Sequence, residues 1–249
     1  MLYRAGIFRS QRLPVPVVVV GNITVGGAGK TPLILHLAQA LVAMGRQPGI
    51  VSRGYGASAS HAREVRLDSS VDDAGDEALL LKRRSGVAVY VGHHRAAAAR
   101  ALLSAYPQCD LILCDDGLQH YALQRDLEIA VIDRRGLMNG WLLPAGPLRE
   151  PVSRLDQVDA CVLNACTIAI KADIPTFRMR LTGARFTLLG DLSRQCEAGE
   201  LCNLRLPLSV SRSVFSTIWR ALACALRRML LPITIVIARQ TSPSRLMRF

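Results

Sequence analysis

The sequence lacks the features that mark membrane-spanning, secreted and metal-cluster proteins. No run approaches the roughly 20 apolar residues that a transmembrane helix needs. Residues 1–14 carry three arginines but no long apolar segment, so we expect no signal peptide. The seven cysteines are odd in number and include no CxxC pair. We therefore expect reduced, buried thiols in a cytosolic protein rather than disulfides or a metal cluster.

Acidic residues are missing from the last fifth of the chain. All 19 of them lie within residues 1–202, while residues 203–249 hold eight arginines, no lysine and no histidine. The formal net charge of +12 therefore divides into +4 for the first 202 residues and +8 for the rest. Nucleic-acid binding would rest on this segment alone, and its three aromatic residues provide little stacking surface. We therefore expect no nucleic-acid partner.

Three interpretations of residues 203–249 are open. Apolar side chains recur there at helical spacing, at Phe215, Ile218, Leu222, Leu226 and Met229. They predict a packed amphipathic helix or, with the arginines, a basic helix on an anionic membrane. The lack of acids on an otherwise balanced chain favours the third interpretation, translation in a shifted reading frame. We therefore expect a basic tail of doubtful origin that packs poorly on the domain before it.

The first 165 residues alternate between predicted strands and helices. Strands are expected at 15–20, 48–52, 87–91, 109–114, 128–132 and 159–163, with a short one at 63–67, and helices at 30–44, 74–84 and 93–105. Apolar strands without polar alternation indicate a mostly parallel sheet with helices on both faces. The sequence therefore predicts an α/β domain over residues 1–202, with a Gly- and Pro-rich surface excursion at 134–157.

A glycine-rich stretch after the first apolar run carries the strongest signal. It reads Thr24-Val25-Gly26-Gly27-Ala28-Gly29-Lys30-Thr31 and lies between an expected strand and an expected helix, as a phosphate-binding P-loop does. Glycines let backbone N–H groups surround a polyphosphate. Lys30 can reach the β- and γ-phosphates, and the Thr31 hydroxyl can bind Mg²⁺. The alternative is an ordinary strand-to-helix turn, and Thr24 stands where the general motif has glycine.

Two carboxylates follow the apolar run 111–114. In P-loop enzymes a carboxylate at such a strand end holds Mg²⁺ directly or through water, and Asp115 and Asp116 suit this role. Asp-Asp-Gly also suits a turn, but its place after a P-loop favours the metal. His120 comes next and could face the phosphate site, although a lone histidine is more often structural.

Other charged residues stand at the ends of expected elements. Asp76 and Glu77 open a helix, where an acid is ordinarily a capping residue. A kinase, however, needs a carboxylate to accept the proton of the attacking hydroxyl. Arg53 and Arg95 lie at strand ends, where an arginine can meet a phosphate. The Pro-bounded stretch 143–151 predicts only a surface loop.

Together these motifs resemble the tetraacyldisaccharide 4′-kinase family, the lipid A 4′-kinases. The resemblance covers about residues 1–200. It rests on the P-loop with its flanks (Leu13 to Pro32), Ser52-Arg-Gly-Tyr-Gly56, Ala74-Gly-Asp-Glu77, Asp115-Asp-Gly-Leu-Gln-His120, Arg125-Asp126 and Leu143-Pro-Ala-Gly-Pro-Leu-Arg-Glu-Pro151. Their order and intervals match, and Thr24 in the P-loop is the family's own pattern.

The resemblance implies ATP-dependent phosphorylation of the 4′-hydroxyl of a tetraacyl glucosamine disaccharide 1-phosphate, giving lipid IV-A. It also implies ATP and Mg²⁺ as cofactors and a peripheral location at the cytosolic face of the bacterial inner membrane. By motif position, residues 24–31 bind the ATP phosphates, and Thr31, Asp115 and Asp116 hold the metal.

The resemblance also assigns catalytic and substrate residues. Asp76 matches the family's catalytic carboxylate, which reverses the capping interpretation, and Asp116 and His120 belong to the catalytic set with it. Four further residues match positions that line the substrate site: Glu77, Arg95, Gln119 and Arg149.

The sequence departs from the family pattern at both ends. The family has an additional N-terminal helix that docks on the membrane, and a C-terminal lobe whose histidine pairs with the catalytic aspartate. Here no histidine follows His120 and neither motif of that lobe is present. We therefore expect a truncated or frameshifted member that binds ATP but transfers phosphate poorly. The alternative is a P-loop switch or partner-binding module, although Val162-Leu163-Asn164-Ala165-Cys166 lacks the Lys and Asp of a guanine-reading motif.

Overall fold

The computed structural model describes residues 8–54, 61–166, 174–182, 185–188, 191–197 and 234–239. The chain divides into two compact units, residues 1–180 with 237–249 and residues 181–236. In the second unit, strands β9 (Arg185–Leu188) and β10 (Asp191–Glu197) form an antiparallel pair. Every residue of the candidate site belongs to the first unit.

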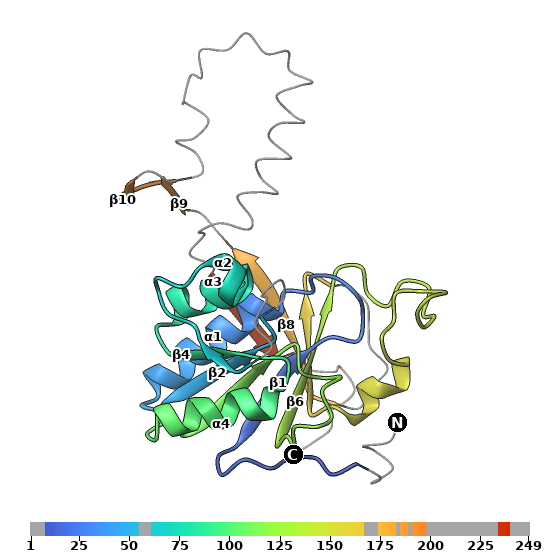
Figure 1. Ribbon diagram of the computed structural model, residues 1–249. Helices are drawn as coiled ribbons and strands as arrows, with labels where there is room; N and C mark the ends of the chain where they lie inside the picture. The colour runs from blue at the N-terminus through green and yellow to red at the C-terminus, as the bar shows by residue number, and fades with distance from the viewer. Residues whose placement is uncertain are drawn as a thin grey trace, which may run out of the picture. The chain divides into compact units, whose positions relative to one another are not determined.

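A mostly parallel sheet forms the centre of the first unit (Figure 1). Its strand order is β11-β8-β7-β6-β1-β5-β2-β4-β3. The strands span Val17–Gly21 (β1), Pro48–Ser52 (β2), Arg63–Glu64 (β3), Ala88–Val91 (β4), Leu111–Asp115 (β5), Leu127–Asp133 (β6), Ala160–Asn164 (β7), Thr176–Thr182 (β8) and Thr234–Arg239 (β11). Strand β3 pairs antiparallel with β4, and the pairs from β4 across to β8 are parallel.

The helices lie on both faces of this sheet. They are α1 (Lys30–Ala43), α2 (Val71–Ala74), α3 (Asp76–Ser85) and α4 (Arg95–Ala105), and a 3₁₀ helix, η1, spans Val152–Gln157. The connections β1-α1-β2 and β2-α3-β4 advance in one direction along the sheet, whereas β4-α4-β5 returns. Since such crossovers are right-handed, α4 covers the face opposite to α1 and α3.

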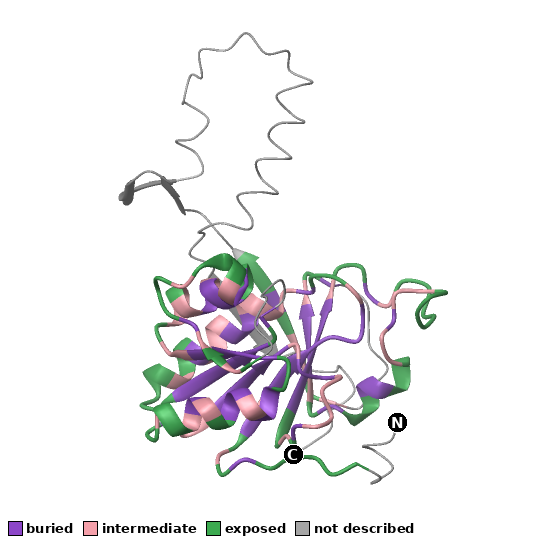
Figure 2. Cartoon of the chain, viewed as in Figure 1, coloured by how far each residue is buried: buried purple, intermediate pink, exposed green. Residues whose placement is uncertain are grey.

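The buried residues follow from the apolar character of the strands. All five residues of β2 are buried, as are the inner residues of β5 and β6 (Figure 2). This is typical of parallel strands covered on both faces. Four free cysteines, Cys109, Cys114, Cys161 and Cys166, are buried in this core, as expected of reduced thiols. Among the described residues, no helix has the length and apolar character needed to cross a membrane.

The expected strands and helices of residues 1–165 are present, with bounds shifted by three residues at most. The short helix α2 was not predicted; the Ser70 hydroxyl accepts from the backbone N–H of Asp73 and caps it. The predicted excursion at 134–157 is a turn-rich segment that ends in η1. Of residues 203–249, only the backbone of β11 is described, and this strand lies beside β8 in the sheet. The helix predicted at 215–229 lies outside the described residues, and the predictions for the tail stay predictions.

Candidate functional site

The carboxyl end of β1 leads directly into the glycine-rich loop, and α1 begins at Lys30. Gly26 and Gly29 have φ angles of 92° and 91°, a left-handed conformation that glycine adopts without steric cost. β1 lies between β5 and β6, where the chain connections diverge to either side. Ligands of open α/β sheets bind at such a switch point, so the loop is placed for one.

Asn22 holds the phosphate loop in shape. This buried side chain donates through Nδ2 to the carbonyl oxygens of Thr24 (2.7 Å) and Gly26 (3.4 Å) and to the Thr24 hydroxyl (3.1 Å). Its Oδ1 accepts from Lys30 Nζ at 3.0 Å. Asn164, at the end of β7, donates to the Ala28 carbonyl oxygen at 3.1 Å. The loop is thus supported from two strands before any ligand binds.

Asp116 joins the P-loop lysine to a third loop. Lys30 Nζ lies 3.4 Å from Asp116 Oδ1, and Arg149 donates to Asp116 Oδ2 at 3.0 Å. Burial by itself would raise the pKa of Asp116, but the charges of Lys30 and Arg149 outweigh it and lower that pKa. Asp116 therefore stays ionised, and it has a left-handed φ of 48° that turns the chain out of β5.

Asp115 differs from its neighbour because it is buried and, within the part of the chain that the structure describes, forms no ion pair. Its Oδ2 accepts from the Ser52 hydroxyl at 3.1 Å, and its Oδ1 has no hydrogen-bond partner among the described residues. Burial, assisted by the charge of Glu77, raises the pKa of Asp115 to about 6. A buried carboxylate oxygen without a partner suits a divalent cation, which would supply the missing charge.

A magnesium site here would need few protein ligands. The described residues contain no group of three His, Cys, Asp or Glu side chains that could hold a metal. P-loop enzymes hold Mg²⁺ with one hydroxyl, one carboxylate, phosphate oxygens and water. Thr31, the second residue of α1, and the adjacent carboxylates of Asp115 and Asp116 fit that donor set.

Positive charge gathers beside the carboxylates, at the ends of β2 and β4. Arg95, the first residue of α4, is only 5% exposed, and its Nε has no hydrogen-bond partner among the described residues. Burial lowers the pKa of Arg95. Burial also lowers the pKa of His120 to about 4, with contributions from Arg95, Arg125, His94 and Arg53. An uncharged His120 and a buried guanidinium beside two carboxylates form a place for an anionic or polar group.

Asp76 is the first residue of α3 and is exposed. Its Oδ1 accepts the backbone N–H of Glu77 at 2.8 Å, so the carboxylate serves the helix end as a cap does. The influence of Glu77 on Asp115 places the start of α3 near the end of β5. The geometry is compatible with both roles of Asp76, and its assignment as a base stays a prediction.

A chain of hydrogen bonds leads from this site toward the amino end of β6. Gln119 donates to the Asn22 carbonyl oxygen (3.0 Å) and to Glu150 (2.9 Å), and its Oε1 lies 3.5 Å from Arg149. Glu150 accepts in turn from the Tyr121 hydroxyl. Tyr121 accepts from Arg154 Nε at 3.1 Å. The neighbours of Arg149 are therefore linked to a buried arginine outside the site.

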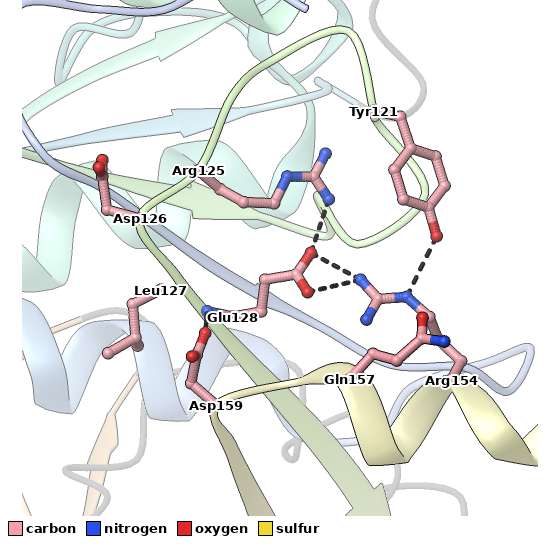
Figure 3. Close-up of a pocket in the computed structure, with 8 residues that line it drawn as sticks. All are labelled: Tyr121, Arg125, Asp126, Leu127, Glu128, Arg154, Gln157 and Asp159. Atoms are coloured by element: carbon pink, nitrogen blue, oxygen red, sulfur yellow. Dashed lines mark hydrogen bonds and ion pairs between the residues drawn. The ribbon is translucent and has the colours of Figure 1, made fainter. Parts of the chain in front are cut away.

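That arginine lines a cavity of about 350 Å³ at the amino end of β6 (Figure 3). Arg154 NH2 binds both oxygens of Glu128, at 2.6 and 2.7 Å, and Arg125 NH1 binds the same carboxylate at 2.8 Å. Arg125 also donates to the carbonyl oxygens of Leu118 and His120. The carboxylate of Glu128 thus holds Arg125 in place, and Arg125 in turn binds the backbone of the loop that carries Gln119 and His120.

The structure brings the predicted residues of the P-loop, Asp115, Asp116, Gln119 and Arg149 to one edge of the sheet. Sequence reasoning missed Asn22, Ser52, Glu150 and Asn164 as supports of that edge. Asn22, Ser52 and Glu150 lie within motifs of the family resemblance, but those motifs assigned them no role. Asn164 lies outside the motifs, and its partner Ala28 is 136 residues away in sequence, so it gave no local signal.

Replacing Glu128 should cost more stability than breaking any exposed pair. Glu128→Gln leaves Arg154 and Arg125 facing a neutral amide, and one buried charge without its partner typically costs about 3–5 kcal/mol. Arg12→Ala, which removes an exposed pair with Asp126 at 3.9 Å, should cost less than about 1 kcal/mol. Urea unfolding measures both. Equal stability of the two variants would contradict this account of the network.

His120 should make folding less favourable in acid. Its pKa is lowered from 6.5 to about 4, so between these values the unfolded chain binds a proton that the folded chain does not. Stability should therefore fall as the pH drops from 6.5 toward 4. Histidine ring resonances, assigned with His120→Gln, report the pKa directly, and the same substitution should flatten the pH dependence of unfolding. A His120 resonance that titrates near pH 6.5 would refute the expectation.

Comparison with known proteins agrees with this geometry. The family model described as tetraacyldisaccharide-1-P 4′-kinase matches residues 1–211. The tetraacyldisaccharide 4′-kinase of Dechloromonas aromatica is 56% identical over 72% of this chain and 54% of the relative. That of Azoarcus sp. is 52% identical over 79% of this chain and 58% of the relative. The chain thus spans somewhat over half the length of these curated relatives.

A solved structure supports the same assignment. A crystal structure of LpxK from Aquifex aeolicus in complex with ATP superposes with a TM-score of 0.66 at 34% identity. The match covers 73% of this chain and 59% of that one. The fold is therefore that of a P-loop NTPase-like α/β protein, and the chain belongs to the tetraacyldisaccharide-1-phosphate 4′-kinase family.

Proposed function

We propose that this protein binds ATP with Mg²⁺ and acts as a tetraacyldisaccharide 4′-kinase. The observation that carries the proposal is the contact between Lys30 of the P-loop and Asp116 after β5, with Arg149 on the same carboxylate. A phosphoryl-transfer site needs cations at the phosphates and a carboxylate for the metal at one edge of the sheet. Membership of the kinase family supplies the substrate class.

The phosphate loop supplies the nucleotide site. Residues 24–31 present backbone N–H groups at the start of α1, and Lys30 adds a charge for the β- and γ-phosphates. Lys30 is already held by Asn22 and Asp116, so little side-chain freedom is lost when a phosphate binds. The relative from Aquifex aeolicus was crystallised with ATP, which supports the choice of nucleotide.

The metal and the acceptor would lie next to one another. Thr31, Asp115 and Asp116 would hold Mg²⁺, which neutralises charge on the transferring phosphoryl group when bound. Asp76 is exposed at the start of α3, where it can accept the proton of an acceptor hydroxyl. In this proposal the acceptor is lined by Glu77, Arg95, Gln119, His120 and Arg149.

The proposed acceptor is the acylated glucosamine disaccharide 1-phosphate, and the expected product is lipid IV-A. Because the acyl chains of this acceptor lie in a membrane, the enzyme must reach it at the membrane surface. This supports a peripheral position at the cytosolic face of the bacterial inner membrane. The buried guanidinium of Arg95 and the neutral ring of His120 suit a polar, anionic acceptor better than an apolar one.

Removing the P-loop lysine should abolish most nucleotide binding. Lys30→Ala deletes the charge that meets the β- and γ-phosphates, and charge-assisted contacts of this kind are worth about 1.5–3 kcal/mol. ATP affinity measured by titration calorimetry should fall by at least about tenfold. Lys82→Ala, in the last turn of α3, removes a lysine outside the P-loop and is the matched control, which should bind ATP normally. An unchanged ATP affinity of the Lys30→Ala variant would contradict the assignment of residues 24–31 as the nucleotide site.

Removing the carboxylate of Asp76 should slow transfer without weakening ATP binding. A positioned general base contributes about 10²- to 10⁴-fold, so Asp76→Asn should reduce kcat by that factor. Asp72→Asn, on the exposed start of α2, controls for a simple change of surface charge. Transfer of labelled phosphate to the disaccharide acceptor is the measurement. Normal turnover by Asp76→Asn would leave Asp76 with its capping role alone.

A further inference from the structure

The loop between β6 and η1 exposes a run of large apolar side chains. Trp141, Leu142 and Leu143 are 66%, 47% and 55% exposed, and Met138 beside them is 51% exposed. Figure 1 shows this loop extending away from the sheet, and Figure 2 shows its outer part exposed. Scattered exposed apolar residues are ordinary, but three in succession on a protruding loop mark a surface that binds something.

The exposure does not come from a loosely held segment. Leu143 N donates to the Leu148 carbonyl oxygen at 2.9 Å, and Leu148 N donates to the Trp141 carbonyl oxygen at 3.0 Å. Gly146 packs so closely that a Cβ there would clash with Asn139 and the Trp141 carbonyl. These contacts close the loop on itself while its largest side chains point out of the fold. The backbone contacts of the loop therefore hold these side chains away from the rest of the protein.

The same loop is fastened to the candidate site. Val25 N donates to the Pro147 carbonyl oxygen at 2.9 Å, and Arg149 N donates to the Ile23 carbonyl oxygen at 2.7 Å. Leu148 forms a bridge with Thr24 at the beginning of the P-loop. Whatever binds the exposed tip is thereby held at a fixed distance from Lys30 and Asp116.

The charge pattern selects the kind of partner. No residue from Gly136 to Leu148 is charged, and the exposed Arg134 stands at the start of this uncharged stretch without a partner among the described residues. Arg135 is paired with Asp133 at 2.6 Å. An indole with aliphatic neighbours and a flanking free cation matches the interface of an anionic bilayer, where tryptophan collects and arginine meets phosphate head groups.

We propose that Trp141, Leu142 and Leu143 form a membrane-inserting tip that, with Arg134, docks the P-loop edge of this protein on an anionic bilayer. The inference rests on the proposed function, since a lipid acceptor makes this edge the one that must face the membrane. The tip enters the acyl boundary, and Arg134 contacts lipid phosphates.

Vesicle binding of the full chain tests the tip. Vesicles of phosphatidylethanolamine with phosphatidylglycerol are compared with phosphatidylcholine vesicles by co-sedimentation. Trp141→Ser with Leu142→Ser should lower the partition coefficient by at least about tenfold, because about 1.5–3 kcal/mol is gained when one large apolar side chain is buried. Arg134→Ala should lose about fivefold on anionic vesicles only, as one interfacial arginine contributes about 1 kcal/mol there.

Matched substitutions separate the tip from general surface changes. Met44→Ser and Leu67→Ser remove apolar residues that are 76% and 63% exposed on other elements, and both should bind vesicles as the unaltered chain does. Arg83→Ala is the corresponding control for charge. Residues 203–249 are present in every variant, so their arginines cannot account for a difference.

Insertion of Trp141 into the bilayer can be detected by its fluorescence. With Trp219→Phe in the background, Trp141 is the remaining indole. Its emission should shift to the blue on anionic vesicles and be quenched by lipids brominated on their acyl chains. Unshifted emission, full binding by the double variant, or a change in oligomeric state in place of vesicle binding would overturn the proposal.

Failure of the tip and failure of the proposed function give different results. ATP binding measured on the same variants should be unchanged, because the tip does not line the P-loop. If vesicle binding were insensitive to the tip while Lys30→Ala still removed ATP binding, the tip alone would be refuted. If the tip bound vesicles and no ATP bound to the unaltered chain, the kinase assignment alone would fail.

Discussion

The contact between Lys30 and Asp116 is the interaction on which the site depends. It joins the loop after β1 to the loop after β5, and Arg149 brings the loop before η1 to the same carboxylate. The loop after β1 and the loop before η1 are also joined by backbone hydrogen bonds, so the carboxylate of Asp116 ties the loop after β5 to an existing pair. Asp116 is only partly buried, but removing one of the two cations beside it would still leave a charge in the site without its partner.

The sequence predicted the sheet well because its signals were local. Buried strands read as uninterrupted apolar runs, and the glycines and Lys30 marked the junction of β1 with α1. The two aspartates were predictable for the same reason, since parallel strands end at one edge of the sheet. Family resemblance suggested the substrate class and the role proposed for Asp76, whereas residue types alone favoured a helix cap.

The supports of the site could not be predicted in this way. Asn164 reaches the P-loop from a strand far along the chain, and Arg154 meets Glu128 through a buried contact between a 3₁₀ helix and a strand. Nothing in either local pattern distinguishes these residues from ordinary surface polar groups. The excursion at 134–157 was recognised as a surface segment, but its closed shape depends on backbone contacts that composition does not encode.

The chain of contacts from Glu128 through Arg154, Tyr121, Glu150 and Gln119 has a consequence for how this protein can change over evolution. Each member shares a hydrogen bond or an ion pair with the next, and Glu128 and Arg154 at one end of the path are buried. A single replacement at the amino edge of β6 therefore alters the surroundings of a residue near the phosphates. Substitutions that are tolerated along this path should occur as compensating pairs. Residues of the path that lie far from any ligand should therefore vary together.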